Sequence, residues 1–279
     1  MTKLSRTWSL MSSSWEILKK DKEIIVFPIF SGIACLMVMA SFAYPIYLGG
    51  LWQSLSSNAR ANDQHIAFYG ILFLFYFCNY FVIVFFNSGI VACAAIRMQG
   101  GDPTVSDGLK TASSRIGLIA GWAFVLATVG VLLRLVEQRS RKIGQVVASL
   151  LGLSWSIASF LVVPILVIEG KGPIDALKES AALLKKSWGE QLMGNFSFGL
   201  VFLLLSLPAF FVIGFAVHAG FSFWMLVFIL LAVEYLILLA LIQSTLQAIF
   251  QAAVYAYAHS GSAPEGFRHD EINDALRRK

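Results

Sequence analysis

Residues 221–257 read FSFWMLVFILLAVEYLILLALIQSTLQAIFQAAVYAY, a long apolar run with one carboxylate near its middle. The run is longer than the about 20 helical residues that cross a bilayer core of roughly 30 Å. Its one charged residue is Glu234. A lone carboxylate at mid-depth in hydrocarbon costs several kcal/mol unless it is protonated or paired. Glu234 is therefore the residue that most needs a functional explanation.

The rest of the chain repeats this pattern of long apolar runs. Of its 279 residues, 58% are hydrophobic and 13% are charged, and the mean hydropathy is +0.75. A water-soluble domain carries roughly 25% charged residues, because its surface must be solvated. This composition excludes a soluble globular protein and indicates an integral membrane protein.

The hydropathy pattern predicts an all-α polytopic membrane protein. The aromatic run Phe68–Phe86 is too long and too evenly apolar for a barrel strand, which alternates over about ten residues. Helices satisfy their backbone hydrogen bonds internally, as hydrocarbon requires. We expect six transmembrane helices, at about residues 24–49, 66–97, 116–136, 145–168, 192–218 and 222–258. Pro164 and Pro208 remove backbone hydrogen bonds and should kink the fourth and fifth of these helices.

The distribution of Lys and Arg predicts the orientation. With the N-terminus inside, sixteen of the 21 basic residues fall in inner segments, and the outer ones are Arg60, Arg134, Arg139, Arg141 and Lys142. Basic residues accumulate in cytoplasmic loops, so we expect both termini in the cytoplasm. The basic loop at residues 137–143 is a local exception. Either this hairpin is short and its side chains reach the interface, or the third and fourth spans do not fully cross. We favour crossing.

Each of the three inner segments that precede a pair of spans carries an apolar stripe at helical spacing. The stripes are Leu4, Trp8, Met11, Trp15 and Leu18; Val105, Leu109, Ala112 and Ile116; and Ile174, Leu177, Ala181, Leu184 and Trp188. Amphipathic helices of this kind lie in the membrane interface, so we expect the stripes to face the acyl chains and the basic residues to face the headgroups. The predicted lipid contacts are Trp8, Trp15, Lys19, Lys20, Lys110, Lys178, Lys185, Lys186 and Trp188.

Short strings recur among these three segments. GDP followed by DGLK at residues 101–110 matches KGP followed by DALK at residues 171–178, and ILKK at 17–20 matches LLKK at 183–186. We infer three pseudo-repeats of an interfacial helix followed by a transmembrane hairpin. The alternative is three unrelated amphipathic loops. Pro103 and Pro173 fit the first turns of the second and third amphipathic helices. Residues 1–259 then form one integral membrane domain, and residues 260–279 form a polar cytoplasmic tail.

The third of these segments resembles a known group of proteins. Val163-Pro164, then EGKGP at 169–173 and ALKES at 176–180, is similar to bacterial six-span inner-membrane proteins that include the YciC-like proteins and the membrane domain attached to some glycerophosphodiester phosphodiesterases. The opening, with SRTW at 5–8, KDKE at 20–23 and Phe27-Pro28, resembles a related family of uncharacterised membrane proteins. The resemblance implies the architecture and a place in the bacterial cytoplasmic membrane. The phosphodiesterase catalytic domain has no counterpart here, so no catalytic residue carries over.

Several polar residues fall inside the predicted spans. The candidate intramembrane polar site comprises Glu234, Gln243, Gln247, Gln251, Asn79 and Asn87. The three glutamines recur every four residues and share one helix face, which either lines an aqueous vestibule or joins helices through amide hydrogen bonds. Glu234 is either a proton, cation or substrate site, or a protonated carboxyl hydrogen-bonded to a neighbouring helix, for which the two asparagines are candidates.

The sequence predicts no catalytic, cofactor-binding or metal site. Its four histidines lack metal-ligand spacing, and it contains no nucleophile elbow, phosphate-binding glycine loop or aspartate-rich motif. The three cysteines lie in apolar runs at unrelated spacing, so they indicate neither a disulfide nor a metal site. The basic balance suits anionic lipid rather than nucleic acid. We therefore expect no enzyme and no cofactor.

Two functions stay open at this point. Three amphipathic helices without a catalytic set favour a non-enzymatic inner-membrane protein. It would be a membrane-organising or accessory subunit of a membrane assembly, with membrane lipids and other membrane proteins as partners. The alternative is a small transporter or channel that uses Glu234. A water-filled cavity reaching Glu234 would favour transport, whereas a packed interior with an exposed apolar flank would favour assembly.

Overall fold

The computed structural model describes residues 3–48, 61–139, 143–195, 198–218, 223–261, 264 and 267. Within these ranges every regular element is a helix, so the all-α prediction is confirmed. In chain order the elements are α1 (Lys3–Lys20), the 3-10 helix η1 (Lys22–Ile25), α2 (Val26–Leu48), α4 (Ala61–Met98), α5 (Val105–Ser114), α6 (Ile116–Arg139), α7 (Ile143–Ala158), α8 (Val162–Pro164), the π-helix η2 (Ile165–Glu169), α9 (Pro173–Asn195), α10 (Phe198–His218) and α11 (Phe223–Ser260).

Among the described residues, five helical segments are long and apolar enough to cross a membrane. They are Lys22–Tyr44, Phe68–Met98, Ile116–Glu137, Gln145–Glu169 and Phe223–Ser260, and α10 contains a shorter apolar segment, Val201–Ala216. These lengths and compositions are those of a multi-pass membrane protein. The predicted start of the fifth span at residue 192 is wrong, because α9 continues through Asn195 and α10 begins at Phe198.

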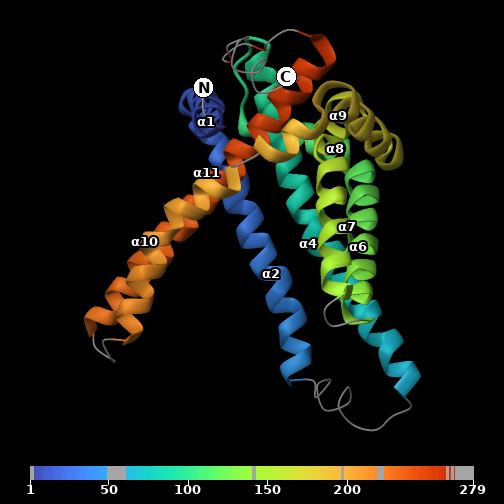
Figure 1. The fold of residues 1–279 in the computed structure, drawn as a ribbon, viewed down its shortest axis with the longest axis vertical. Helices are drawn as coiled ribbons and strands as arrows, with labels where there is room; N and C mark the ends of the chain where they lie inside the picture. The colour runs from blue at the N-terminus through green and yellow to red at the C-terminus, as the bar shows by residue number, and fades with distance from the viewer. Residues whose placement is uncertain are drawn as a thin grey trace.

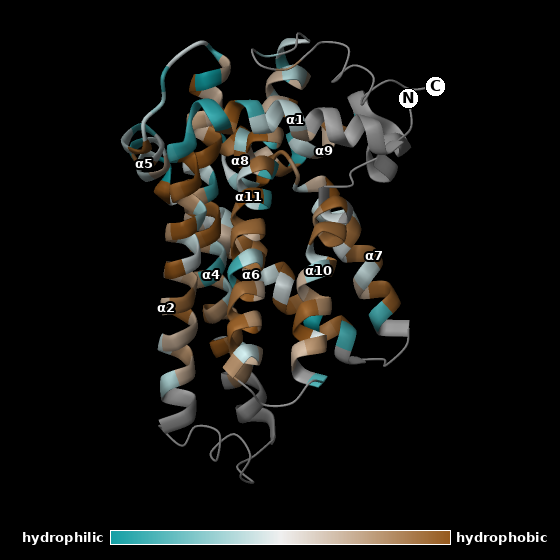
Figure 2. Ribbon diagram, turned by 90° about the vertical axis from the view of Figure 1, so that its left-hand side faces the viewer, coloured by the Kyte–Doolittle hydropathy of each residue, from teal (hydrophilic) through white to brown (hydrophobic). Residues whose placement is uncertain are grey.

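The hydrophobic core lies at one end of the molecule, which we call the core end. It joins α1, η1, the last turns of α4, α8 with η2, and the second half of α11. From there α2, α4 and the α6–α7 pair extend away, and the α10–α11 hairpin leans away from α2 (Figure 1). Figure 2 shows mainly hydrophobic residues along these extended helices. α1 and the last turn of α11 both lie at the core end. Phe267 is buried in this core, so part of the predicted polar tail packs against the helices.

A tight contact around Phe27 joins α2, α4 and α5. The Phe27 ring is fully buried and lies against Gly89 of α4 and Gly108 of α5. A Cβ atom at Gly108 would come within 2.5 Å of the ring, 2.8 Å of the Cys93 sulfur and 2.9 Å of the Gly89 carbonyl oxygen. The missing side chains at these two glycines therefore create the space that the ring fills.

The fourth predicted span is interrupted rather than simply kinked. α7 ends at Ala158, and the chain turns before α8 and the π-helix η2. The backbone N–H of Leu161 in this turn donates a hydrogen bond of 3.0 Å to the hydroxyl of Ser180 on α9, and both residues are fully buried. A buried backbone N–H needs an acceptor from the protein, because an unpaired one costs free energy. The Ser180 hydroxyl is that acceptor here.

The amphipathic helices pack differently from the prediction. The sequence analysis expected their apolar stripes to face acyl chains, but Met11, Leu18, Ala112 and Leu184 lie in the core of the protein itself. These residues of the stripes cover the end of the helix bundle. Other residues of the stripes remain exposed, namely Trp15 at 38%, Ile116 at 51% and Ile174 at 51%.

Two proline predictions have different outcomes. Pro173 is the first residue of α9, as expected. Pro103 precedes α5, whose N-cap is Thr104. The Thr104 side chain accepts a hydrogen bond from the Asp107 N–H, and the Asp107 carboxylate accepts one from the Thr104 N–H. This capping box starts the helix in place of the proline.

We predict that Gly108→Ala destabilises the protein by about 1–3 kcal/mol, the usual cost of overpacking a core. Alanine normally stabilises a helix relative to glycine by roughly 0.5–1 kcal/mol. Thermal unfolding in detergent measures the difference. Gly117→Ala on α6 is the matched control, because nothing lies within 4 Å of a Cβ there. An equal thermal midpoint for the two variants would contradict the Phe27 contact.

We also predict that Ser180→Ala lowers stability by about 1–3 kcal/mol, because the buried Leu161 N–H loses its acceptor. The same unfolding assay applies. Ser154→Ala is the control, since the Ser154 hydroxyl is exposed and bonds only to the Leu150 carbonyl one turn earlier. If both serines can be replaced with the same small effect, Ser180 does not hold the break in place.

Candidate functional site

A polar cavity lies between α4 and the second half of α11. Its volume is about 260 Å³, and it is lined by Asn87, Ala240, Gln243, Ser244, Gln247, Ala248 and Gln251. The glutamines share a helix face because they are spaced four residues apart. Neighbouring residues such as Thr245 and Leu246 are buried against the core. The structure thus brings together four of the six residues proposed from the sequence, namely Asn87, Gln243, Gln247 and Gln251.

The chemistry of this cavity is that of neutral amides. Each Asn or Gln side chain offers two N–H donors and one carbonyl acceptor. None of the seven lining residues carries an ionisable side chain. Such a lining suits ordered water or the polar part of a neutral ligand. It provides no group that could carry a proton or neutralise an ion.

The other two proposed residues lie elsewhere. Glu234 is exposed on α11 and precedes Gln243 by nine residues, which is about 13 Å along a helix. It is not among the residues that line the polar cavity. Asn79 donates a hydrogen bond of 2.9 Å to the Phe75 carbonyl within α4. Glu234 and the glutamines are therefore separate features.

The predicted lipid contacts are exposed wherever their side chains are described. These are Trp15, Lys19, Lys20, Lys110, Lys178 and Lys185. The side chains of Trp8, Lys186 and Trp188 lie outside the described part of the structure. Lys19 places its ammonium 6.0 Å from the centroid of the Trp15 ring, a cation–π distance.

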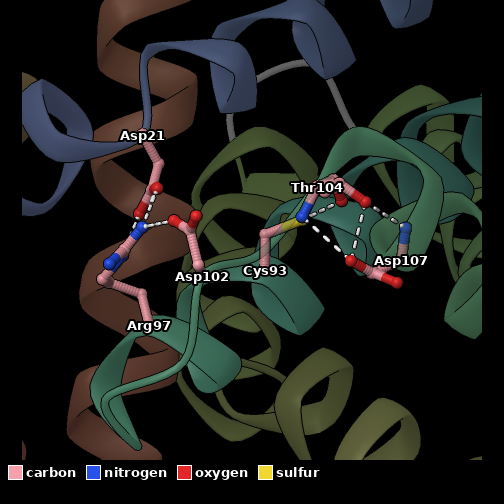
Figure 3. A network of polar contacts seen from close by, with 6 residues as sticks. All are labelled: Asp21, Cys93, Arg97, Asp102, Thr104 and Asp107. Carbon is pink, nitrogen blue, oxygen red and sulfur yellow. Dashed lines mark hydrogen bonds and ion pairs between the residues drawn. The ribbon is translucent and has the colours of Figure 1, made fainter.

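An ion cluster that the sequence analysis did not identify joins α1, α4 and the loop before α5. Arg97 donates to both carboxylate oxygens of Asp21 and to Asp102 (Figure 3). Asp21 is almost fully buried, and its partner lies 76 residues away. Beside this cluster, hydrogen bonds from Thr104 hold the pKa of the Asp107 carboxyl below its usual value. Removal of one partner of a buried ion pair is costly, so this cluster fixes α1 against α4.

A second cluster ties α9 and η2 to the end of α11. The Tyr255 hydroxyl donates to Glu169. Lys171 pairs at 2.5 Å with Glu169 and at 2.5 Å with Glu179. Hydrogen bonds to Glu169 and then to Glu179 raise the pKa of Lys171 above its ordinary value. Glu169 and Lys171 belong to the EGKGP string, which the sequence analysis treated only as a marker of resemblance.

Within the described residues, no group of three or more His, Cys, Asp or Glu side chains could hold a metal ion. Each of the two ion clusters places one cation between two carboxylates and joins segments at the core end.

We predict that Gln247→Cys reacts with a water-soluble thiol reagent roughly tenfold or more faster than Glu234→Cys, because thiolate formation requires water. The three native cysteines are first replaced by alanine. Ser260→Cys at the helix end gives the rate for full exposure to water, and Leu231→Cys beside Glu234 gives the rate in hydrocarbon. Fast labelling at Glu234 would reveal an aqueous path to the carboxylate and would favour transport.

Comparison with known proteins identifies the family. Residues 66–266 match the model of a family of unknown function, DUF6159. The matched range begins within α4 and runs past the end of α11. No curated protein matches the chain. Because the match covers well over half of the sequence, the chain belongs to this family of unknown function.

Proposed function

We propose that the protein is a non-enzymatic integral protein of the bacterial inner membrane, a membrane-organising or accessory subunit of a membrane assembly. Its contact with other membrane proteins is the outer flank of α11 around Glu234, which carries Leu230, Leu231, Ile237 and Leu238. The observation that carries this proposal is the exposure of Glu234 on that flank.

The flank around Glu234 is apolar and exposed. On α11 the residues one turn before and after Glu234 are also exposed, namely Leu230, Leu231, Ile237 and Leu238. The two helices are held together at this level by a hydrogen bond of 2.8 Å from the Tyr235 hydroxyl to the Leu205 carbonyl. The hairpin is thus a defined unit with a bare outer surface.

Lipid is a poor neighbour for this surface, because the Glu234 carboxylate lies on it. Neither an ion pair nor a hydrogen bond connects Glu234 to any other residue that the structure describes. Counting from Phe223, it lies about 16 Å along α11, close to the middle of a hydrocarbon core of roughly 30 Å. Charged groups at such depth face other protein or a cavity, because hydrocarbon cannot solvate them. A donor from another transmembrane helix would satisfy Glu234 and cover the apolar flank.

The proposal includes the finer architecture. In chain order α1, α5 and α9, the helices with the apolar stripes, each precede a pair of strongly apolar helical segments, which supports six spans in three pseudo-repeats. The basic residues favour a cytoplasmic core end carrying both termini. Exposed lysines there contact anionic lipid, and nucleic acid is not a partner. The likeness to YciC-like proteins is part of the same proposal.

Transport is the second candidate, and the polar cavity between α4 and α11 is the observation that favours it. A pathway would need that cavity to connect with Glu234. The residues that line it are neutral and do not include Glu234. The exposed flank therefore supports the assembly role better.

We predict that photo-crosslinking amino acids at Leu230 and Leu238 capture another protein chain in the native membrane. Met37 on α2 is the matched control, because it is 62% exposed on a helix without charged residues, which lipid alone can cover. Protein adducts from Met37 as abundant as those from α11 would contradict the proposal. So would lipid adducts alone at Leu230 and Leu238.

The same assay tests the carboxylate. Interhelical hydrogen bonds contribute about 0.6–1.7 kcal/mol, so Glu234→Leu should reduce the crosslinked fraction roughly three- to twentyfold. Glu234→Gln can still form a hydrogen bond and should lose less. Ile237→Leu on the same flank serves as the control for packing changes. An unchanged crosslinked fraction in Glu234→Leu would show that the carboxylate has no role in assembly.

A further inference from the structure

An apolar groove lies between α1 and the α10–α11 hairpin. Its volume is about 310 Å³, and its lining comprises Met11, Ser12, Trp15, Phe202, Leu205, Leu239, Ile242 and Leu246. Met11, Phe202 and Leu246 are buried, whereas Trp15 and Leu205 are about 40% exposed, at 38% and 41%. The groove therefore has a closed floor and an open rim. Its size falls at the lower end of the roughly 300–1,000 Å³ that ligand sites occupy.

The position along α11 places this groove at a membrane boundary. A helix needs about 20 residues to cross the hydrocarbon core. Counted from Phe223, this length ends near Ile242, which lines the groove. Beyond Ile242, α11 enters the packed core end, where α1 packs against α11 (Figure 1). The groove thus lies where acyl chains meet headgroups.

Positive charge marks one edge of the groove. The last turn of α1 carries Lys19 and Lys20, both exposed. The Lys19 ammonium lies 6.0 Å from the ring of Trp15, which is itself part of the lining. An apolar groove with a tryptophan at its rim and the Lys19 ammonium beside that ring matches a lipid chain attached to an anionic headgroup.

We propose that this groove holds one acyl chain of an anionic phospholipid, with its phosphate beside Lys19. The inference deepens the proposed lipid contact and rests on the proposed membrane position of α1. It does not require the contact at Glu234. The occupant is a single flexible chain, because a helix with side chains is about 10–12 Å across and would not fit this volume.

Native mass spectrometry of the intact protein, released from mild detergent, tests the proposal. We expect the purified protein to retain one phospholipid, and Leu205→Trp to lose it because the indole fills the groove. Leu204→Trp is the matched control, since Leu204 is 51% exposed on the same helix but does not line the groove. Equal lipid retention by the two variants would overturn the proposal.

The headgroup is tested by competition between phosphatidylglycerol and phosphatidylethanolamine. A basic residue near an anionic surface contributes about fivefold in affinity. The doubly substituted Lys19→Gln, Lys20→Gln protein should therefore lose most of its preference for phosphatidylglycerol while still binding phospholipid. The doubly substituted Lys178→Gln, Lys185→Gln protein should keep the preference. A wild-type protein that binds the two lipids equally would refute the anionic headgroup.

A third measurement uses the unaltered chain and does not depend on any variant folding. Phosphatidylglycerol with a photoreactive acyl chain should label residues of the groove lining, among them Met11 and Trp15 of α1. Labelling confined to residues outside this lining would exclude the groove as the site. Protein crosslinks at Leu230 and Leu238 are scored separately, so failure of the lipid site and failure of the assembly role give different results.

Discussion

Hydrocarbon offers polar groups no solvent, and this constraint governs how the helices are arranged. Inside the bundle it is met by specific side chains. The Ser180 hydroxyl accepts the hydrogen bond that the broken fourth segment would otherwise lack, and the Tyr235 hydroxyl joins α11 to a carbonyl of α10. The glutamines of α11 face Asn87 across a shared cavity. Glu234 differs, because no partner for it exists within the described chain. A second protein is the simplest source of that partner.

The location of the core explains why the rest of the molecule is open. Buried residues are concentrated where α1, the end of α4, η2 and the second half of α11 meet. Two ion clusters join the helices in that region. Away from it the helices present long apolar surfaces. A membrane protein gains no hydrophobic stabilisation from packing such surfaces against one another rather than against lipid. The core end therefore stabilises the fold, and the helices that extend from it remain available for contact with lipid or other proteins.

Local patterns in the sequence predicted most of the helices. Runs of about 20 apolar residues fix the spans, and the spacing of Met11 with Leu18 identifies α1 as amphipathic. The surface that such a stripe faces could not be predicted, because lipid and a protein core select the same residues. Contacts between segments that are far apart in the sequence could not be predicted either. Nothing local in the sequence pairs Asp21 with Arg97, or Ser180 with Leu161. In the candidate site, the four-residue spacing of the glutamines predicted that they share one helix face. Their separation from Glu234 follows from the position of Glu234 on the outer flank.

The central claim is that protein, and not lipid, covers Glu234. Electron cryomicroscopy of the protein extracted in polymer discs with its surrounding membrane tests this most directly. The account predicts helical density from another chain along the outer face of α11, with a donor group beside the carboxylate. Ordered acyl chains along that flank, with no neighbouring protein, would contradict it.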